Sequence, residues 1–152
     1  MKKLLMGILL VTCMVFGVTL VAQASTIEEA KALAEKGAAY MKANGKDKAI
    51  AEFNNPNGEF VKGDLYLFAI DFNGIILAHG GNPKLVGQSF LEMKDPTGKY
   101  FIKEQLDLAK SKGSGWNEYM WTNPATKKVQ SKKSWIQRVE GTDTYIGCGI
   151  FQ

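Results

Sequence analysis

The fold is decided by Trp116-Asn-Glu-Tyr-Met-Trp-Thr-Asn-Pro124 and by the run that follows it, Lys132-Lys133-Ser134-Trp135. Side chains alternate along a strand, so a strand through the first stretch places Asn117, Tyr119 and Trp121 on one face. The second run predicts the partner strand. One wall of a small protein would then carry aromatic rings and a lysine, a combination suited to binding a small anion.

The same alternation separates the two lysines of the second run. Lys132 and Lys133 are neighbours, so only one of them can face the inner side of the sheet. Most lysine side chains are solvated, and a buried ammonium group needs an anion. That anion is either an Asp or Glu of the protein or a carboxylate from outside. Strand alternation alone does not decide which lysine is buried.

The first 24 residues predict a signal peptide rather than part of the fold. Lys2 and Lys3 precede an almost entirely apolar segment, residues 4–21, and Ala22-Gln23-Ala24 has the small-x-small pattern of a cleavage site. An uncleaved membrane anchor over residues 4–21 is the alternative, because the segment approaches spanning length. A lipoprotein site at Cys13 fits less well. We therefore expect a periplasmic or secreted protein, or alternatively a membrane-anchored one that faces the periplasm.

The expected mature chain, residues 25–152, is long enough for one domain with its own core. The formal net charge of the whole chain is +4, and Lys2 and Lys3 supply part of it, so the bias is too weak to predict nucleic-acid binding. Cys148 is the only cysteine after Cys13, which excludes an internal disulfide from the mature chain. We expect Cys148 to be buried in the last strand.

Helices are predicted at two places. Ser25-Thr26-Ile27-Glu28 has the pattern of a capping box, and two helices are expected within residues 25–54. The turn-forming residues 54–58 predict a connection from helix to sheet in preference to a mobile lid. A further amphipathic helix is predicted over residues 100–112.

Strands occupy the rest of the chain. Asn73-Gly74 predicts a hairpin between residues 65–72 and 75–79. Three more strands are expected at residues 116–122, 132–138 and 145–151. The order of helices, hairpin, crossing helix and three-stranded meander predicts an α+β domain with an antiparallel sheet, in which residues 63–152 form the sheet and the crossing helix.

His79 is the only histidine of the chain and the first candidate for chemistry. No Gly-x-Ser-x-Gly elbow accompanies it, and Asp71 is the only acid close to it in sequence, so neither a catalytic triad nor a metal site is predicted. Gly80-Gly81 matches no phosphate-binding fingerprint. His79 is therefore expected either to cap a strand end or to contact a ligand. An enzyme or redox protein based on His79 is the least favoured alternative.

Taken together, the motifs resemble those of the single Cache domain, type 2. The motifs before the crossing helix are Gly63-Asp-Leu-Tyr-Leu-Phe, Asp71-Phe-Asn-Gly, Ala78-His-Gly-Gly-Asn-Pro, Leu85-Val-Gly-Gln and Lys94-Asp-Pro-Thr-Gly-Lys. The later ones are Gly113-Ser-Gly-Trp-Asn-Glu-Tyr-Met-Trp-Thr-Asn-Pro, Lys132-Lys-Ser-Trp and Ile146-Gly-Cys-Gly-Ile-Phe. The resemblance implies a PAS-like fold, in which a long N-terminal helix packs on a central antiparallel sheet of about five to six strands. It also implies an extracytoplasmic sensor for small molecules such as short carboxylates, of the kind that serves chemotaxis and signal transduction.

The resemblance further implies a set of ligand-binding residues. Tyr119 and Trp121 match the Tyr-x-Trp pair of the family, and His79 matches its histidine after the first hairpin. Lys132 matches the lysine three places before an aromatic residue, which is Trp135 in this chain. Trp135 stands where tyrosine is common in the family, and Lys133 adds a second charge.

We therefore expect a non-enzymatic domain that binds a short organic acid and acts through a partner protein, such as a membrane receptor. Lys132 would supply the counter-charge, Tyr119 and His79 the hydrogen bonds, and Trp121 with Phe68 the apolar walls. No cofactor, metal or nucleic acid is expected. The alternative is a one-helix sensor subunit anchored by residues 4–21. The sequence leaves open the ligand, the partner and the oligomeric state.

Overall fold

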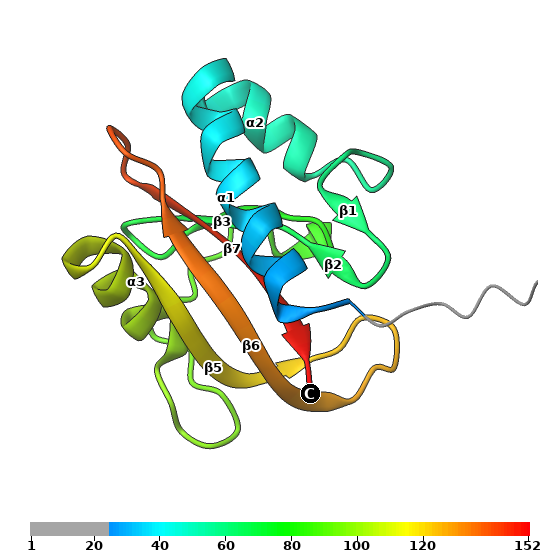
Figure 1. The fold of residues 1–152 in the computed structure, drawn as a ribbon. Coiled ribbons are helices and arrows are strands. Elements are labelled where there is room, and N and C mark those ends of the chain that lie inside the picture. The colour runs from blue at the N-terminus through cyan, green and yellow to red at the C-terminus, as the bar shows by residue number, and fades with distance from the viewer. Residues whose placement is uncertain (1–24) are drawn as a thin grey trace, which may run out of the picture.

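The structure is a computed structural model that describes residues 25–152 (Figure 1). The predicted signal peptide and the alternative anchor lie outside these residues, and the boundary of the domain at residue 25 stays a prediction. Within residues 25–152, no helix combines the length and the apolar character that crossing a membrane requires.

Two helices begin the described chain, α1 (Ile27–Asn44) and α2 (Lys46–Phe53). The capping box forms one residue later than the sequence analysis placed it: Glu29 N–H donates to Thr26 Oγ1 at 3.2 Å, and Thr26 N–H donates to Glu29 Oε2 at 2.9 Å. Both Ser25 and Thr26 have a glutamate three residues later, so the pattern alone could not separate them. Gly45, at φ 86°, ends α1 where a residue with a side chain would be strained.

The central sheet has five antiparallel strands in the order β4-β3-β7-β6-β5. Their bounds are β3 (Phe68–Asp71), β4 (Ile76–His79), β5 (Ser114–Thr122), β6 (Val129–Arg138) and β7 (Thr144–Phe151). An additional two-stranded ladder joins β1 (Val61–Lys62) to β2 (Leu65–Tyr66). A 3₁₀ turn, η1 (Pro83–Leu85), follows β4. The predicted α+β fold is therefore confirmed.

One predicted strand is interrupted. The sequence predicts a single strand over residues 65–72, whereas the structure divides it at Leu67 into β2 and β3. The reason is a change of partner: Tyr66 pairs with Val61 in β1, and Phe68 pairs with His79 and Gly147 in the main sheet. Branched and aromatic content predicts an extended chain and carries no information about this change.

The two faces of the sheet are covered by different helices (Figure 1). The helix α1 packs on β6 and β7, and α3 (Phe101–Ser111) packs on β5 and β6. Alternation along the strands assigns Trp135, Ile146 and Cys148 to the α1 side. It assigns Tyr119, Ile136 and Tyr145 to the α3 side. The sheet therefore divides the molecule into two apolar cores.

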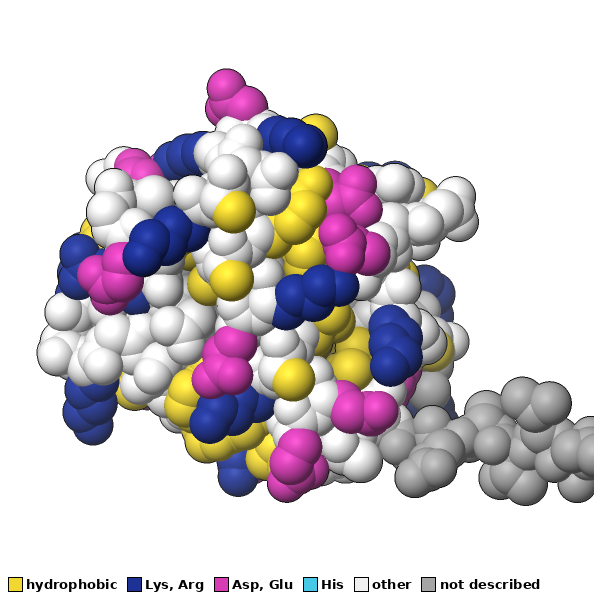
Figure 2. All heavy atoms as spheres, turned by 45° about the horizontal axis from the view of Figure 1, so that its top comes forward, with side chains coloured by type: hydrophobic (Ala, Val, Ile, Leu, Met, Phe, Trp, Pro, Cys, Tyr) yellow, Lys and Arg dark blue, Asp and Glu magenta, His cyan; other side chains and the backbone are white. Residues whose placement is uncertain are grey.

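The outer surface over the N-terminal helices carries basic side chains interspersed with acidic ones, with apolar side chains between them (Figure 2). Lys36 pairs with Glu59, and Lys46 pairs with Asp143 at 2.8 Å. Charges of both signs thus alternate on this face, which agrees with the weak net charge of the chain.

Candidate ligand-binding site

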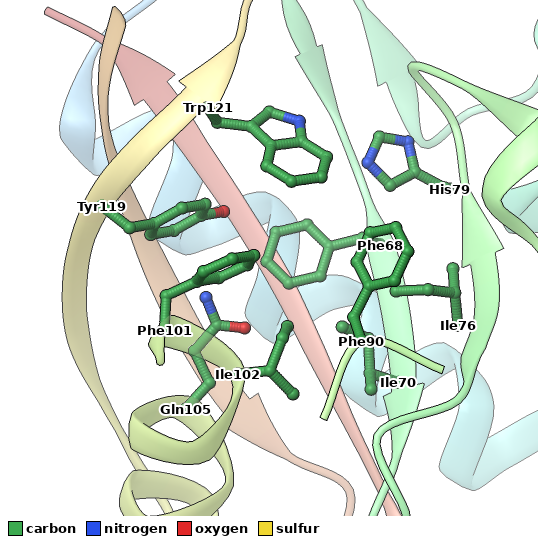
Figure 3. A pocket seen from close by; sticks show the side chains of 10 residues that line it. All are labelled: Phe68, Ile70, Ile76, His79, Phe90, Phe101, Ile102, Gln105, Tyr119 and Trp121. Carbon is green, nitrogen blue, oxygen red and sulfur yellow. The ribbon is translucent and has the colours of Figure 1, made fainter. Parts of the chain in front are cut away.

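A cavity lies on the α3 side of the sheet (Figure 3). Its lining is mostly apolar and consists of Phe68, Ile70, Ile76, His79, Phe90, Phe101, Ile102, Gln105, Tyr119 and Trp121. The volume of the cavity is only about 20 Å³. That is room for about one water molecule. Any larger ligand requires the lining side chains to move apart.

Of the predicted residues, the structure brings Phe68, His79, Tyr119 and Trp121 to this cavity, whereas Lys132 and Trp135 do not line it. Tyr119 lies opposite Lys132 across β5 and β6, and Phe68 lies opposite His79 across β3 and β4. Tyr119 stacks on Phe101 with the ring centroids 4.7 Å apart, and its hydroxyl lies 3.2 Å from Ser134 Oγ. The predicted placement of Asn117, Tyr119 and Trp121 on one strand face is confirmed by this register.

The Phe68 ring is held in place by a glycine on the neighbouring strand. Phe68 pairs with Gly147, and a Cβ atom at Gly147 would collide with the Phe68 ring. Because Gly147 leaves this space free, the ring can lie flat on β7 and still form part of the cavity wall.

Lys132 is the buried lysine of the pair. Its side chain is 1% exposed, and its Nζ donates to Tyr66 Oη at 2.7 Å. The ammonium group lies 4.0 Å from the ring centroid of Tyr66 and 4.9 Å from that of Phe151. No carboxylate of residues 25–152 forms a salt bridge with it. Lys132 does not line the cavity directly but lies behind its wall, 5.6 Å from the centroid of the Phe68 ring.

Because Lys132 is buried, we expect the free energy of unfolding to depend on pH. Loss of hydration lowers the pKa of Lys132 to about 7, against 10.5 for an ordinary lysine. Between these values the unfolded chain binds a proton that the folded ligand-free chain does not, so the free energy of unfolding should rise with pH, by up to about 1.4 kcal/mol per unit. Urea unfolding between about pH 7 and pH 8.5 measures this, and Lys132→Met should remove the rise. A pH-independent wild type would show that Lys132 keeps its proton.

His79 is buried and neutral. Its side chain is 4% exposed, and burial, reinforced by the charge of Lys132, lowers the pKa of His79 to about 3. Nδ1 accepts a hydrogen bond from Asn82 N–H at 2.9 Å, so the proton of the neutral ring sits on Nε2. The ring therefore caps the end of the hairpin and also offers one N–H donor at the edge of the cavity, beside Trp121 (Figure 3).

Sequence reasoning missed two polar residues of this site. Tyr66 accepts the hydrogen bond from Lys132, and its ring centroid lies 5.0 Å from that of His79. Burial raises the pKa of Tyr66 well above its ordinary value, so its hydroxyl stays protonated and can donate a hydrogen bond. The sequence could have indicated Tyr66, because it lies two residues before Phe68 in the predicted strand and alternation places the two side chains on the same face.

Gln105 is the second missed residue and forms the polar floor of the cavity. It is fully buried, accepts from Tyr145 Oη at 3.0 Å and donates to Asn117 Oδ1 at 3.1 Å. Asn117 in turn donates to Glu104 Oε2 at 3.0 Å. The position of Gln105 between Ile102 and Leu106 on the apolar stripe of the helix was the available signal.

The structure does not bring Trp135 to the cavity. Trp135 lies three residues after Lys132 on the same strand, so alternation turns the two side chains to opposite faces. The Trp135 ring packs on the α1 side, 5.1 Å from the Trp116 centroid, with Lys31 Nζ 4.5 Å from its own centroid. Lys133 lies on the same side, with Nζ 5.8 Å from the centroid of Trp116.

Cys148 is buried in β7, as predicted, and burial raises the pKa of its thiol to about 12. Among residues 25–152, no group of three or more histidine, cysteine, aspartate or glutamate side chains could hold a metal ion. The polar groups that line the cavity are the His79 and Trp121 ring N–H groups, the Tyr119 phenol and the Gln105 amide. The Tyr66 phenol and the Lys132 ammonium group lie behind the aromatic rings.

A family model described as Cache domain matches residues 23–152 of the chain. The chain belongs to the Cache domain family. This confirms the resemblance to a single Cache domain on which the sequence analysis relied. Cache domains of this kind serve as sensor domains in chemotaxis receptors and histidine kinases.

Among solved structures, the Cache domain is similar to a methyl-accepting chemotaxis protein from Vibrio parahaemolyticus. The identity is 26%, the TM-score is 0.67, and the match covers 82% of this chain and 86% of the other. Another similar structure is described as the structural basis for carboxylic acid recognition by a Cache chemosensory domain. It is 25% identical at a TM-score of 0.64, with 82% of this chain and 86% of the other covered.

A curated relative of this Cache domain is the sensor histidine kinase MctS of Rhizobium johnstonii. The two are 28% identical over 88 residues, which are 58% of this chain and 19% of the kinase. The chain thus matches about one fifth of the length of this relative.

Proposed function

We propose that this Cache domain binds a short organic acid, as its carboxylate, in the cavity between the sheet and α3. The observation that carries the proposal is the burial of Lys132 without a carboxylate partner among the described residues. A buried cation is costly unless an anion accompanies it. A bound carboxylate would supply that anion and would stabilise the charged form of Lys132.

Each residue around the cavity has a role in this proposal. Lys132 turns from Tyr66 toward the incoming carboxylate, and the Tyr66 hydroxyl then donates a hydrogen bond to the same group. His79 donates from Nε2, and Tyr119 offers its hydroxyl. Phe68 and Trp121 form apolar walls that suit a short hydrocarbon tail. Trp135 has no part in the binding that we propose, because it lies on the other face of the sheet.

The solved Cache domain that is described as recognising a carboxylic acid supports this choice of ligand class. The apolar lining gives a second reason: apart from His79, Gln105 and Tyr119, the walls consist of phenylalanine, isoleucine and Trp121. A second charge on the ligand would be buried there without a partner. We therefore favour monocarboxylates over dicarboxylates.

A thermal-shift comparison of acids with their amides tests this proposal. Acetate and propionate should raise the melting temperature, and at about 100 times the dissociation constant a ligand adds ~2.7 kcal/mol to the free energy of unfolding. Acetamide and propionamide have nearly the same shape without the charge and should produce little or no shift. If acids and amides shift the melting temperature equally, or neither does, the carboxylate is not the feature that the domain recognises.

We further propose that the domain works outside the cytoplasm and passes its signal to a partner protein. The predicted signal peptide and the similarity to sensory receptors support this. The alternative is retention of residues 4–21 as a membrane anchor. The mass of the exported protein distinguishes them: cleavage gives an N-terminus at Ser25, and an intact N-terminal segment would favour the anchored sensor subunit.

A further inference from the structure

An open groove lies outside the cavity and shares part of its wall. The two hollows have His79, Phe90 and Trp121 in common, and the groove has a volume of about 620 Å³. The Trp121 ring centroid lies 6.2 Å from that of His79 and 6.0 Å from that of Phe90. These three side chains therefore lie between a cavity that has room for about one water molecule and a much roomier groove.

The groove carries positive charge and no negative charge. Lys84, in η1, and Lys127, in the loop between β5 and β6, line it, and its lining includes neither aspartate nor glutamate. Both lysines are exposed, and neither forms a salt bridge with a carboxylate of residues 25–152. A cleft lined by charges of one sign concentrates ions of the opposite sign.

The backbone at Lys127 is strained in a way that fixes its position. Lys127 has φ 60° and is the only non-glycine residue with positive φ in the part of the chain that the structure describes. This left-handed conformation costs about 1 kcal/mol for a residue with a side chain. Lys127 N–H donates to Asn123 O at 2.8 Å, and Asn123 N–H donates to Lys128 O at 2.9 Å, which closes the loop. The loop thus holds a lysine at a position that glycine or asparagine would occupy without strain.

We propose that the outer groove is a first binding compartment, in which Lys84 and Lys127 capture carboxylate anions before they pass Trp121 into the cavity. This rests on the proposed function. The need for a first compartment follows from the cavity itself, which holds about one water molecule until its wall moves. An anion held in the groove is present when the wall opens, so capture raises the rate of association and leaves the rate of dissociation unchanged.

Stopped-flow tryptophan fluorescence with propionate as the probe tests the capture step. The variant is Lys84→Gln with Lys127→Asn, because asparagine tolerates the left-handed backbone at residue 127. The matched control is Lys128→Gln, which removes an exposed neighbouring lysine that does not line the groove. Each protein is measured at about 0.01 M and about 0.15 M salt, where the screening length falls from about 30 Å to about 8 Å.

We expect the double variant to associate with propionate about threefold or more slowly at low salt, to lose most of its salt dependence and to dissociate at the wild-type rate. Lys128→Gln should behave as wild type. Unchanged association and salt dependence in a double variant that still binds propionate would overturn the capture step and leave the proposed function standing. Failure of the wild-type protein to bind propionate or acetate at all would overturn both.

Discussion

Replacing Lys132 with methionine is expected to lower the affinity for acetate or propionate at least about 30-fold, equivalent to ~2 kcal/mol. The charge is the only buried cation that the proposal places against the carboxylate, and methionine keeps a similar length of apolar chain. Because the substitution removes an unpaired buried ammonium group, the free energy of unfolding at neutral pH should not fall. Isothermal titration calorimetry and urea unfolding measure the two effects.

The matched control is Lys133→Met, on the same strand but on the α1 face. It should leave propionate affinity within about twofold of wild type, because a half-buried charge on the far side of the sheet makes no contact with the cavity and is partly screened by salt. Equal losses of affinity in the two variants would mean that general electrostatic attraction, and not a specific contact with Lys132, holds the acid.

Gly147→Ala is expected to destabilise the fold by about 1–3 kcal/mol and to weaken binding. The added methyl group would occupy the space in which the Phe68 ring lies, and the ring would have to move into the cavity or lift β3 from β7. Urea unfolding gives the loss of stability, and calorimetry with propionate gives the loss of affinity.

A double variant tests whether collision with the Phe68 ring causes the loss of stability in Gly147→Ala. Phe68→Leu shortens the side chain that the new methyl group meets, so Gly147→Ala combined with Phe68→Leu should be more stable than the sum of the separate losses predicts. Strict additivity of the two losses would show that Gly147 acts through some contact other than the Phe68 ring.

Much of the fold followed from the sequence because its signals are local. Alternation placed Tyr119 and Trp121 on one face, and the Asn73-Gly74 turn placed the first hairpin. The break at Leu67 did not follow, because it depends on which distant segment each half of the strand meets. Tyr66 pairs with Val61 in the two-stranded ladder and not in the main sheet, and no local sequence pattern predicts that pairing.

The candidate site was predictable to the extent that strand register determines it. His79 and Phe68 lie opposite each other in the hairpin that the Asn73-Gly74 turn predicts, although the ladder also contains a register shift between Ala69 and Ile70. Trp135 was assigned to the ligand through the family resemblance, although its odd spacing from Lys132 already placed it on the other face. Gln105 was missed because a glutamine on a helix is ordinarily solvated, and only tertiary packing shows that Tyr145 and Asn117 bond to it.

The most direct measurement is the distance from Lys132 Nζ to the nearest carboxylate oxygen in a crystal of the domain grown with propionate. The account predicts about 2.7–3.2 Å, with the side chain of Trp121 displaced toward the outer groove and the hydrocarbon tail among the rings of the cavity. Propionate bound elsewhere, with Lys132 still donating to Tyr66 and the cavity closed, would contradict it.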